Sequence, residues 1–222
     1  MKVADLDQPV RDGTAPPEDR RLGRDTTGYR VRGERVPSVT EVIGLAGLSS
    51  IEDVIAKAGA AVVERAAVRG KAVHAYCELV DLDPGFDLEA VPESLRGYVA
   101  AYARFVEEHR FRPVLSEEVV VSEALGFAGT LDRLGEYQGR PTLIDIKTPA
   151  TACPAWPVQT AGYAIAVFEQ YGQLVDRGSL QLQPNGRYRL HTHPDRADAD
   201  LFLAALRVAQ HRLAHGLATL EE

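Results

Sequence analysis

Three consecutive segments with the pattern of β-strands, residues 117–122, 126–137 and 140–148, most restrict how this chain can fold. Each is rich in Val, Ile, Leu or Phe, and only short turns separate them, so they predict an antiparallel meander. Segments of helical periodicity precede and follow the three strands. Because a sheet with apolar faces needs helices to cover it, this order of elements favours an α/β or α+β domain.

The flanking segments complete the predicted fold. Ser38 and Glu41 have the spacing of a capping box at a helix start, and Ser49 and Glu52 repeat it. Further helices are predicted over 69–80, 92–110, 157–172 and 195–217, and hairpins over 28–37 and 179–193. We therefore expect one domain over 28–222, with a mixed central sheet flanked by helices and a helical N-terminal part. Residues 1–27 are polar and aperiodic and predict a flexible arm.

Composition and charge exclude several classes of protein. The net charge of -7 argues against a generic nucleic-acid binder. The segment 20–35 nevertheless carries six arginines, which either bind phosphates or belong to a solvated arm. No apolar leader or membrane-length apolar run occurs, so we expect neither a signal peptide nor a membrane span. Cys77 and Cys153 are too few for a disulfide framework or a four-cysteine cluster, and a reducing cytoplasmic location is expected.

The segment LIDIKT, residues 143–148, places charges within an apolar strand. Asp145 and Lys147 are two residues apart, so their side chains point to the same face. If Gln138-Gly139 is the turn between the second and third strands, Asp132 lies opposite Asp145, with Cβ atoms about 4.5–5.5 Å apart. Two such carboxylates repel each other, so either one is protonated or a cation lies between them.

A divalent cation suits this arrangement, because Mg²⁺ prefers carboxylate oxygens, water and phosphate. Lys147 would then orient or deprotonate a water, or stabilise charge on a phosphate. The alternative is that Asp145 and Lys147 form an ordinary surface charge pair, which contributes less than about 1 kcal/mol to stability.

Four short motifs occur in a fixed order along the predicted elements: GKAVH (70–74), GTLD (129–132), DIK (145–147) and QTAGY (159–163). Together they resemble the PD-(D/E)xK nuclease superfamily, in particular its RecB-like and phage-type exonuclease branch. The resemblance covers roughly residues 29–205. It implies a restriction-endonuclease-like core and hydrolysis of phosphodiester bonds with Mg²⁺ or Mn²⁺.

The resemblance also implies roles for individual residues. It gives metal ligands as Asp132, Asp145, the backbone carbonyl of Ile146, and His74 approaching the metal. It gives Lys147 as the catalytic lysine, and Gln159 and Tyr163 as residues that support the site and position DNA. For the last two, a packing stripe with Tyr163 in the core is the alternative. Glu78, one turn after His74, either orients the imidazole or is a solvated helix charge.

Three further residues have two interpretations each. Glu117 and Glu118 begin a predicted strand; one of them could reach a metal, but we interpret both as edge charges. Trp156 could stack on a base or sugar, but we expect it to pack within the protein.

The expected function is a metal-dependent DNA nuclease, an exonuclease acting on linear duplex DNA or its ends in recombination, repair or phage DNA processing. A homo-oligomer or a recombination partner protein is compatible with the sequence. One alternative is a non-catalytic DNA-binding recombination-accessory protein that retains the fold, although the complete set of Asp132, Asp145 and Lys147 argues against it. A hydrolase acting on another substrate is the third alternative.

Overall fold

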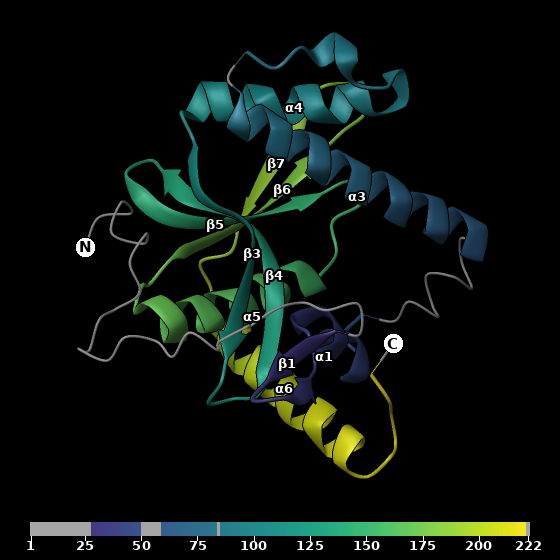
Figure 1. Ribbon diagram of the computed structural model, residues 1–222, viewed down its shortest axis with the longest axis vertical. Coiled ribbons are helices and arrows are strands. Elements are labelled where there is room, and N and C mark those ends of the chain that lie inside the picture. Colours follow the sequence, from purple (N-terminus) through teal and green to yellow (C-terminus); the bar gives the residue numbers. More distant parts are fainter. Residues whose placement is uncertain (1–27, 50–58, 84, 221–222) are drawn as a thin grey trace.

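A five-stranded mixed sheet forms the centre of the computed structural model, which describes residues 28–49, 59–83 and 85–220. Across the sheet the strands are β3 (Arg112–Ser122), β4 (Phe127–Tyr137), β5 (Arg140–Lys147), β6 (Asp176–Leu182) and β7 (Tyr188–Thr192). Figure 1 shows this sheet between two groups of helices. The predicted α/β architecture, a mixed sheet flanked by helices, is confirmed.

The connections between strands follow from their direction. β3, β4 and β5 form the predicted antiparallel meander. Gln138 and Gly139 close its second turn with φ angles of 52° and 76°, the positive values that a tight two-residue turn requires. β6 is parallel to β5, so a crossover must join them, and α5 (Ala155–Tyr171) provides it. β7 then pairs antiparallel to β6 as the predicted hairpin.

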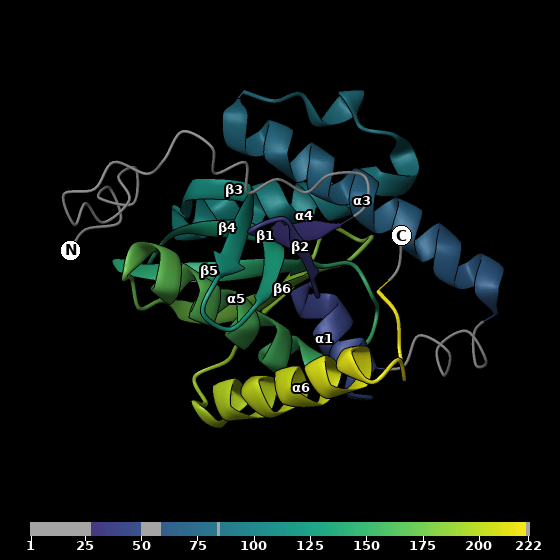
Figure 2. The same ribbon diagram turned by 60° about the horizontal axis from the view of Figure 1, so that its bottom comes forward.

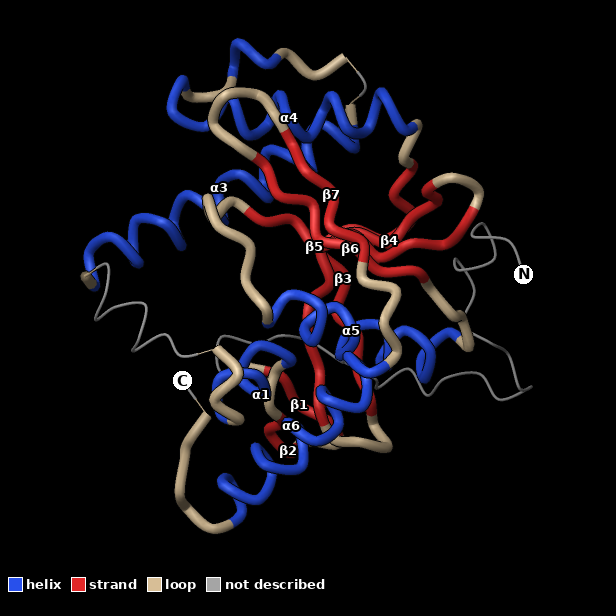
Figure 3. The backbone as a smooth tube through the Cα atoms, turned by 180° about the vertical axis from the view of Figure 1, so that it is seen from behind, coloured by secondary structure: helices blue, strands red, loops and turns tan. Residues whose placement is uncertain are grey.

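Helices cover both faces of the sheet, as Figures 1 and 2 show. α3 (Ala60–Leu82) and α4 (Glu93–His109) lie on one side, joined through the short 3-10 helix η2 (Leu88–Ala90). α5 lies on the other side, where it packs against α6 (Ala197–Ala214) and α1 (Val39–Leu45). The view from behind in Figure 3 shows the same order of helices, strands and helices.

Strand β5 contributes to the apolar core on both faces of the sheet. Leu143 belongs to a buried cluster with residues of α1, α5 and α6, whereas Ile144 and Ile146 belong to a cluster with residues of α3 and α4. A strand covered on both faces has to be apolar almost throughout. Asp145 interrupts this apolar run and is only 2% exposed, so its carboxylate is buried.

The N-terminal described segment packs beside the meander. β1 (Tyr29–Val31) and β2 (Glu34–Val36) form the predicted hairpin, with Gly33 in its turn at a φ of 83°. The predicted capping box is also present: Ser38 Oγ accepts the Glu41 N–H at 3.0 Å, and Glu41 Oε2 accepts the Ser38 N–H at 2.7 Å. This reciprocal pair fixes the start of α1.

Some predicted boundaries differ from the structure. Residues 69–80, predicted as a separate helix, belong to the continuous helix α3, and β3 begins at Arg112 rather than at residue 117. The helix start predicted at Ser49–Glu52 reaches into residues 50–58, and the predicted arm is residues 1–27; both segments lie outside the described residues. Within the described ranges, no helix combines the length and apolar character needed to cross a membrane.

Candidate active site

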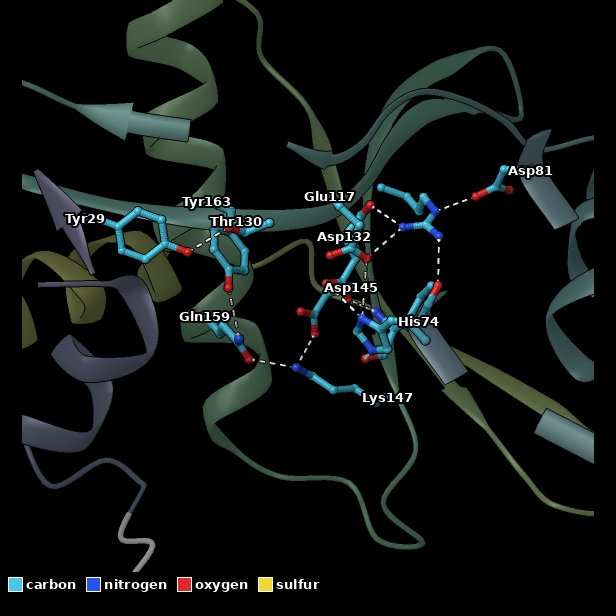
Figure 4. Close-up of polar contacts among 12 residues, drawn as sticks. Tyr29, His74, Asp81, Glu117, Thr130, Asp132, Asp145, Lys147, Gln159 and Tyr163 are labelled. Atoms are coloured by element: carbon cyan, nitrogen blue, oxygen red, sulfur yellow. Dashed lines mark hydrogen bonds and ion pairs between the residues drawn. The ribbon is translucent and has the colours of Figure 1, made fainter. Parts of the chain in front are cut away.

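His74 lies in the second half of α3 and points toward the middle of β4 and the C-terminal end of β5 (Figure 4). The neighbouring side chains Val73 and Cys77 are fully buried, which fixes the face that α3 turns toward the sheet. His74 Nε2 lies 3.1 Å from the carbonyl oxygen of Ile146, and Nδ1 lies 3.4 Å from Asp132 Oδ1. The imidazole therefore contacts both strands that carry the predicted carboxylates.

The pairing of β4 with β5 brings Asp132 and Asp145 together. It extends to Arg133 and Ile144, so the two aspartates are the next residues on each strand, in the predicted register. Asp132 then continues the pairing with its side chain, because Oδ2 accepts the N–H of Ile146 at 2.6 Å. Asp132 and Asp145 are 9% and 2% exposed, so two buried carboxylates stand at the end of the ladder.

Two cationic side chains offset the repulsion between these carboxylates. Lys147 Nζ lies 2.8 Å from Asp145 Oδ2, on the same face of β5 as predicted. Burial raises the pKa of Asp145 to about 6, although the ammonium of Lys147 opposes this shift. Burial would also raise the pKa of Asp132, but His74 and Lys147 lower it below its ordinary value. Burial disfavours the imidazolium of His74, yet the charge of Asp132 and hydrogen bonds to both neighbouring carboxylates raise its pKa to about 10.

Glu117, which the sequence analysis interpreted as an edge charge, joins this group from β3. Its Oε1 lies 3.6 Å from His74 Nδ1 and 3.0 Å from Arg133 Nη1. The backbone of Glu117 has a φ of 50°, a left-handed value that is uncommon for a non-glycine residue. Counting along the β3–β4 pairing from Ser122 and Phe127 places Glu117 opposite Asp132. This register is the signal in the sequence that could have identified it.

His74, Glu117 and Asp132 could hold a metal ion, because one ligand atom of each lies within 4.8 Å of the others. Two carboxylates and a neutral imidazole fit a divalent cation, so binding of the ion through His74 would release the proton that the carboxylates hold on the imidazole. Of the other predicted ligands, Asp145 is engaged by Lys147 and the Ile146 carbonyl by His74. The structure thus places all four predicted ligands side by side and adds Glu117 to them.

A hydrogen-bonded chain extends from Lys147 into α5. Lys147 Nζ donates to Gln159 Oε1 at 2.9 Å, and Gln159 Nε2 donates to the Tyr163 hydroxyl at 3.2 Å. Tyr163 is only 6% exposed and belongs to the core, so its packing role and its hydrogen bond coexist. Burial, with the nearby charge of Asp145, raises the pKa of the Tyr163 phenol. Gln159 is thus placed to hold the Lys147 ammonium.

The remaining candidates lie outside this group. Within the described part of the chain, the imidazole of His74 contacts Glu117, Asp132 and Ile146, and Glu78 is not among its hydrogen-bond or ion-pair partners. The negative charge of Glu78 instead helps to raise the pKa of Asp81, after the larger effect of burial.

Trp156 and the two cysteines also lie apart from the carboxylates. Trp156 is 6% exposed and packs edge-on against His191, in agreement with the predicted packing role. Cys77 is buried and Cys153 half-buried, and both are free thiols.

The sequence of most of the chain matches a known protein family. Residues 49–214 match the model of a family described as the PD-(D/E)XK nuclease superfamily. Comparison with curated proteins gave no significant match.

Several solved structures are similar to parts of this chain. The protein SSO0001 is 14% identical, with a TM-score of 0.48 over 82% of this chain and 78% of its own. A candidate exonuclease from Eubacterium rectale is 12% identical, with a TM-score of 0.45 over 84% and 90%. An alkaline exonuclease from Laribacter hongkongensis is 21% identical, with a TM-score of 0.32 over 53% and 70%. Because these scores lie below 0.5, the family assignment rests on the family model.

Proposed function

The chain belongs to the PD-(D/E)XK nuclease superfamily, and from this premise we propose that it is a Mg²⁺- or Mn²⁺-dependent deoxyribonuclease. Its substrate is linear duplex DNA, which it degrades as an exonuclease in recombination, repair or phage DNA processing. The exonuclease assignment is supported by His74 and by the pair Gln159 and Tyr163, the features of the sequence that resemble the exonuclease branch.

One observation carries the proposal: buried carboxylates, a histidine and a lysine meet at the end of one ladder (Figure 4). Asp132 and Asp145 are almost completely buried, and Glu117 and His74 complete a set of donors for a hard cation. Burial of several charged groups destabilises a fold unless each charge is compensated. A cluster of this kind therefore points to a functional site rather than to a structural ion pair.

Different residues of the chain have different roles in the proposed phosphodiester hydrolysis. Asp132, Glu117 and His74 would hold the cation, with Asp145 beside them. When bound, a divalent cation stabilises negative charge on the phosphate and makes a nearby water more acidic. The Lys147 ammonium, fixed between Asp145 and Gln159, orients the attacking water and stabilises charge on the phosphate.

A cleavage assay tests this proposal. End-labelled linear duplex and covalently closed circular DNA are incubated with the protein in Mg²⁺, in Mn²⁺ and in a chelator. We expect metal-dependent loss of the linear substrate only. Asp145→Asn and Lys147→Ala should each lower the rate about a hundredfold or more.

The matched control is Arg140→Ala, which removes an exposed ion pair with Asp176 at the other end of β5. It should retain the wild-type rate, since exposed pairs contribute little. Undiminished cleavage by folded Asp145→Asn or Lys147→Ala would refute the assignment of the site. Cleavage of circular DNA at the same rate as linear DNA would refute the assignment as an exonuclease.

A further inference from the structure

Arg133 is a fully buried arginine, 0% exposed, that follows Asp132 on β4. Its Nη1 donates to Glu117 Oε1 at 3.0 Å and to the main-chain oxygen of Asp132 at 2.7 Å. Its Nη2 donates to the main-chain oxygen of His74 at 3.5 Å. One guanidinium thus contacts each of the three residues whose ligand atoms group around the candidate cation site.

The other side of this guanidinium is held by Asp81 and Tyr102. Arg133 Nε donates to Asp81 Oδ2 at 2.5 Å, and the Asp81 side chain is only 4% exposed. The Tyr102 hydroxyl donates to the second oxygen, Asp81 Oδ1, at 2.7 Å. The guanidinium also lies over the Tyr102 ring, 5.8 Å from its centroid. Asp81 on α3 and Tyr102 on α4 therefore fix the direction of the Arg133 side chain.

The position of Glu117 makes such support necessary. Its left-handed backbone, at a φ of 50°, is unfavourable for a residue with a β-carbon and persists only where surrounding contacts hold it. Its carboxylate also points toward that of Asp132, so the two groups repel each other. The rigid fork of an arginine can bind a carboxylate and main-chain oxygens at once in fixed geometry, which a lysine cannot do.

We infer that Arg133, held in place by Asp81 and Tyr102, is a positioning residue that keeps His74, Glu117 and Asp132 within ligand distance of one divalent cation. This inference rests on the proposed function, because it concerns the same cation. Residues that orient metal ligands change metal affinity or activity about 10–100-fold when they are substituted. The role differs from that of a general stabilising ion pair, which would change the folded fraction and leave the affinity of folded molecules unaltered.

The test compares Arg133→Lys with a matched variant, Arg177→Lys. Arg177 is also largely buried, with 10% of its side chain exposed, and it binds Pro157, Thr160, Asp195 and Asp198 on α5 and around the start of α6. Mn²⁺ binding is measured by isothermal titration calorimetry on folded protein, and stability by urea unfolding in chelator. We expect Arg133→Lys to raise the Kd for Mn²⁺ about 10–100-fold. Arg177→Lys should lose stability and keep the wild-type Kd.

A second variant keeps the test decisive if Arg133→Lys does not fold. Tyr102→Phe retains the ring below Arg133 and removes only the hydroxyl that holds Asp81. It should weaken Mn²⁺ binding less than Arg133→Lys, while Tyr98→Phe, one turn earlier on α4, should not change it.

Two outcomes would overturn the inference: an unchanged Kd in folded Arg133→Lys, or an unchanged Kd in Tyr102→Phe where Arg133→Lys does not fold. If the wild type itself binds no Mn²⁺ and cleaves no DNA, the proposed function fails as well. If the wild type binds Mn²⁺ and cleaves DNA, and the variants keep the wild-type Kd, only the positioning role of Arg133 is refuted.

Discussion

Glu117 and Glu118 are consecutive residues of β3 with different surroundings. Glu117 Oε1 lies 3.6 Å from His74 Nδ1, whereas Glu118 contributes, after burial, to the raised pKa of Tyr171 on α5. Replacing a glutamate by glutamine removes the charge and keeps the shape. We therefore expect Glu117→Gln to weaken Mn²⁺ binding and to slow DNA cleavage about tenfold or more.

Glu118→Gln is the matched control, and it should leave the affinity for Mn²⁺ and the rate of DNA cleavage unaltered. Calorimetric titration and initial rates of cleavage of a labelled duplex measure the two effects. If both variants behave alike, Glu117 is an edge charge after all and the cation is held without it.

Gln159 gives a second prediction about a single residue. Its side chain accepts from Lys147 and donates to Tyr163, so Gln159→Leu removes the amide contact of the ammonium, leaves its ion pair with Asp145, and keeps a similar volume. A catalytic group that loses its fixed position slows the reaction, by up to about a hundredfold for a displacement near 1 Å. We expect kcat to fall by about tenfold to a hundredfold with little loss of stability.

The same helix α5 supplies the control for this prediction. Gln170 also donates to a tyrosine hydroxyl, that of Tyr171, at 2.9 Å, and it binds the N–H of Val121. Gln170→Leu removes equivalent contacts without approaching Lys147, so kcat should not change. A packing stripe, the alternative for Gln159, predicts that neither substitution affects kcat in folded protein.

The spacing of residues explains which parts of the site could be predicted from the sequence. Asp132, Asp145 and Lys147 follow from strand periodicity and a two-residue turn, which are local properties. Glu117 depends on the register across a four-residue loop and on a backbone turned to a φ of 50°. The register could have been counted from the loop, but periodicity contains no information on the left-handed conformation, because contacts with residues distant in sequence stabilise it.

Among the helices, α4 shows how close packing limits substitution. A β-carbon added at Gly97 would lie 1.8 Å from the carbonyl oxygen of Pro184, in the turn between β6 and β7. Alanine normally stabilises a helix interior by roughly 0.5–1 kcal/mol relative to glycine. Here the contact is with backbone, which cannot rotate away, so we expect Gly97→Ala to destabilise the fold by about 1–3 kcal/mol.

Gly44 on α1 provides the same substitution without the contact. Its added β-carbon would meet only the Ser49 oxygen at 3.8 Å, an ordinary van der Waals distance. Urea unfolding should therefore show Gly44→Ala unaltered or slightly more stable. Equal stability of the two variants would mean that α4 sits farther from the β6–β7 turn than the structure has it.

The type and order of the elements could be predicted better than their ends. The helix predicted over residues 92–110 is α4, whose buried residues are Tyr98, Val99, Ala101, Tyr102 and Phe105. The prediction of a separate helix over 69–80 was wrong, because α3 continues through Gly70: a glycine in a helix interior lowers stability without forcing an end. Gly70 lies close to Thr148, and the sequence pattern does not reveal this tertiary neighbour.

Across the whole molecule, the candidate site joins two layers that have separate cores. His74 belongs to α3, whose residues Val73 and Cys77 pack with α4 and one face of the sheet. Lys147 is tied instead to α5, which packs on the other face. The carboxylates of the sheet lie between them. Movement of α3 away from the sheet would remove His74 from the site, and movement of α5 would remove the contact that holds Lys147.

This arrangement predicts where a bound cation will protect the protein from opening. A ligand that binds only the closed site adds stability to every segment whose opening breaks that site, about 2.7 kcal/mol at a hundred times the Kd. Opening of α3 removes His74, whereas fraying of α6 removes no candidate ligand. We therefore expect Mn²⁺ to slow amide hydrogen exchange around His74 in α3 and in β4 and β5, and to leave α6 unaffected.

Asp132→Asn, whose amide oxygen can still accept the Ile146 N–H, should lose this protection while its exchange in chelator stays that of the wild type. Equal slowing in α6, or protection that survives in Asp132→Asn, would show that Mn²⁺ acts elsewhere on the molecule.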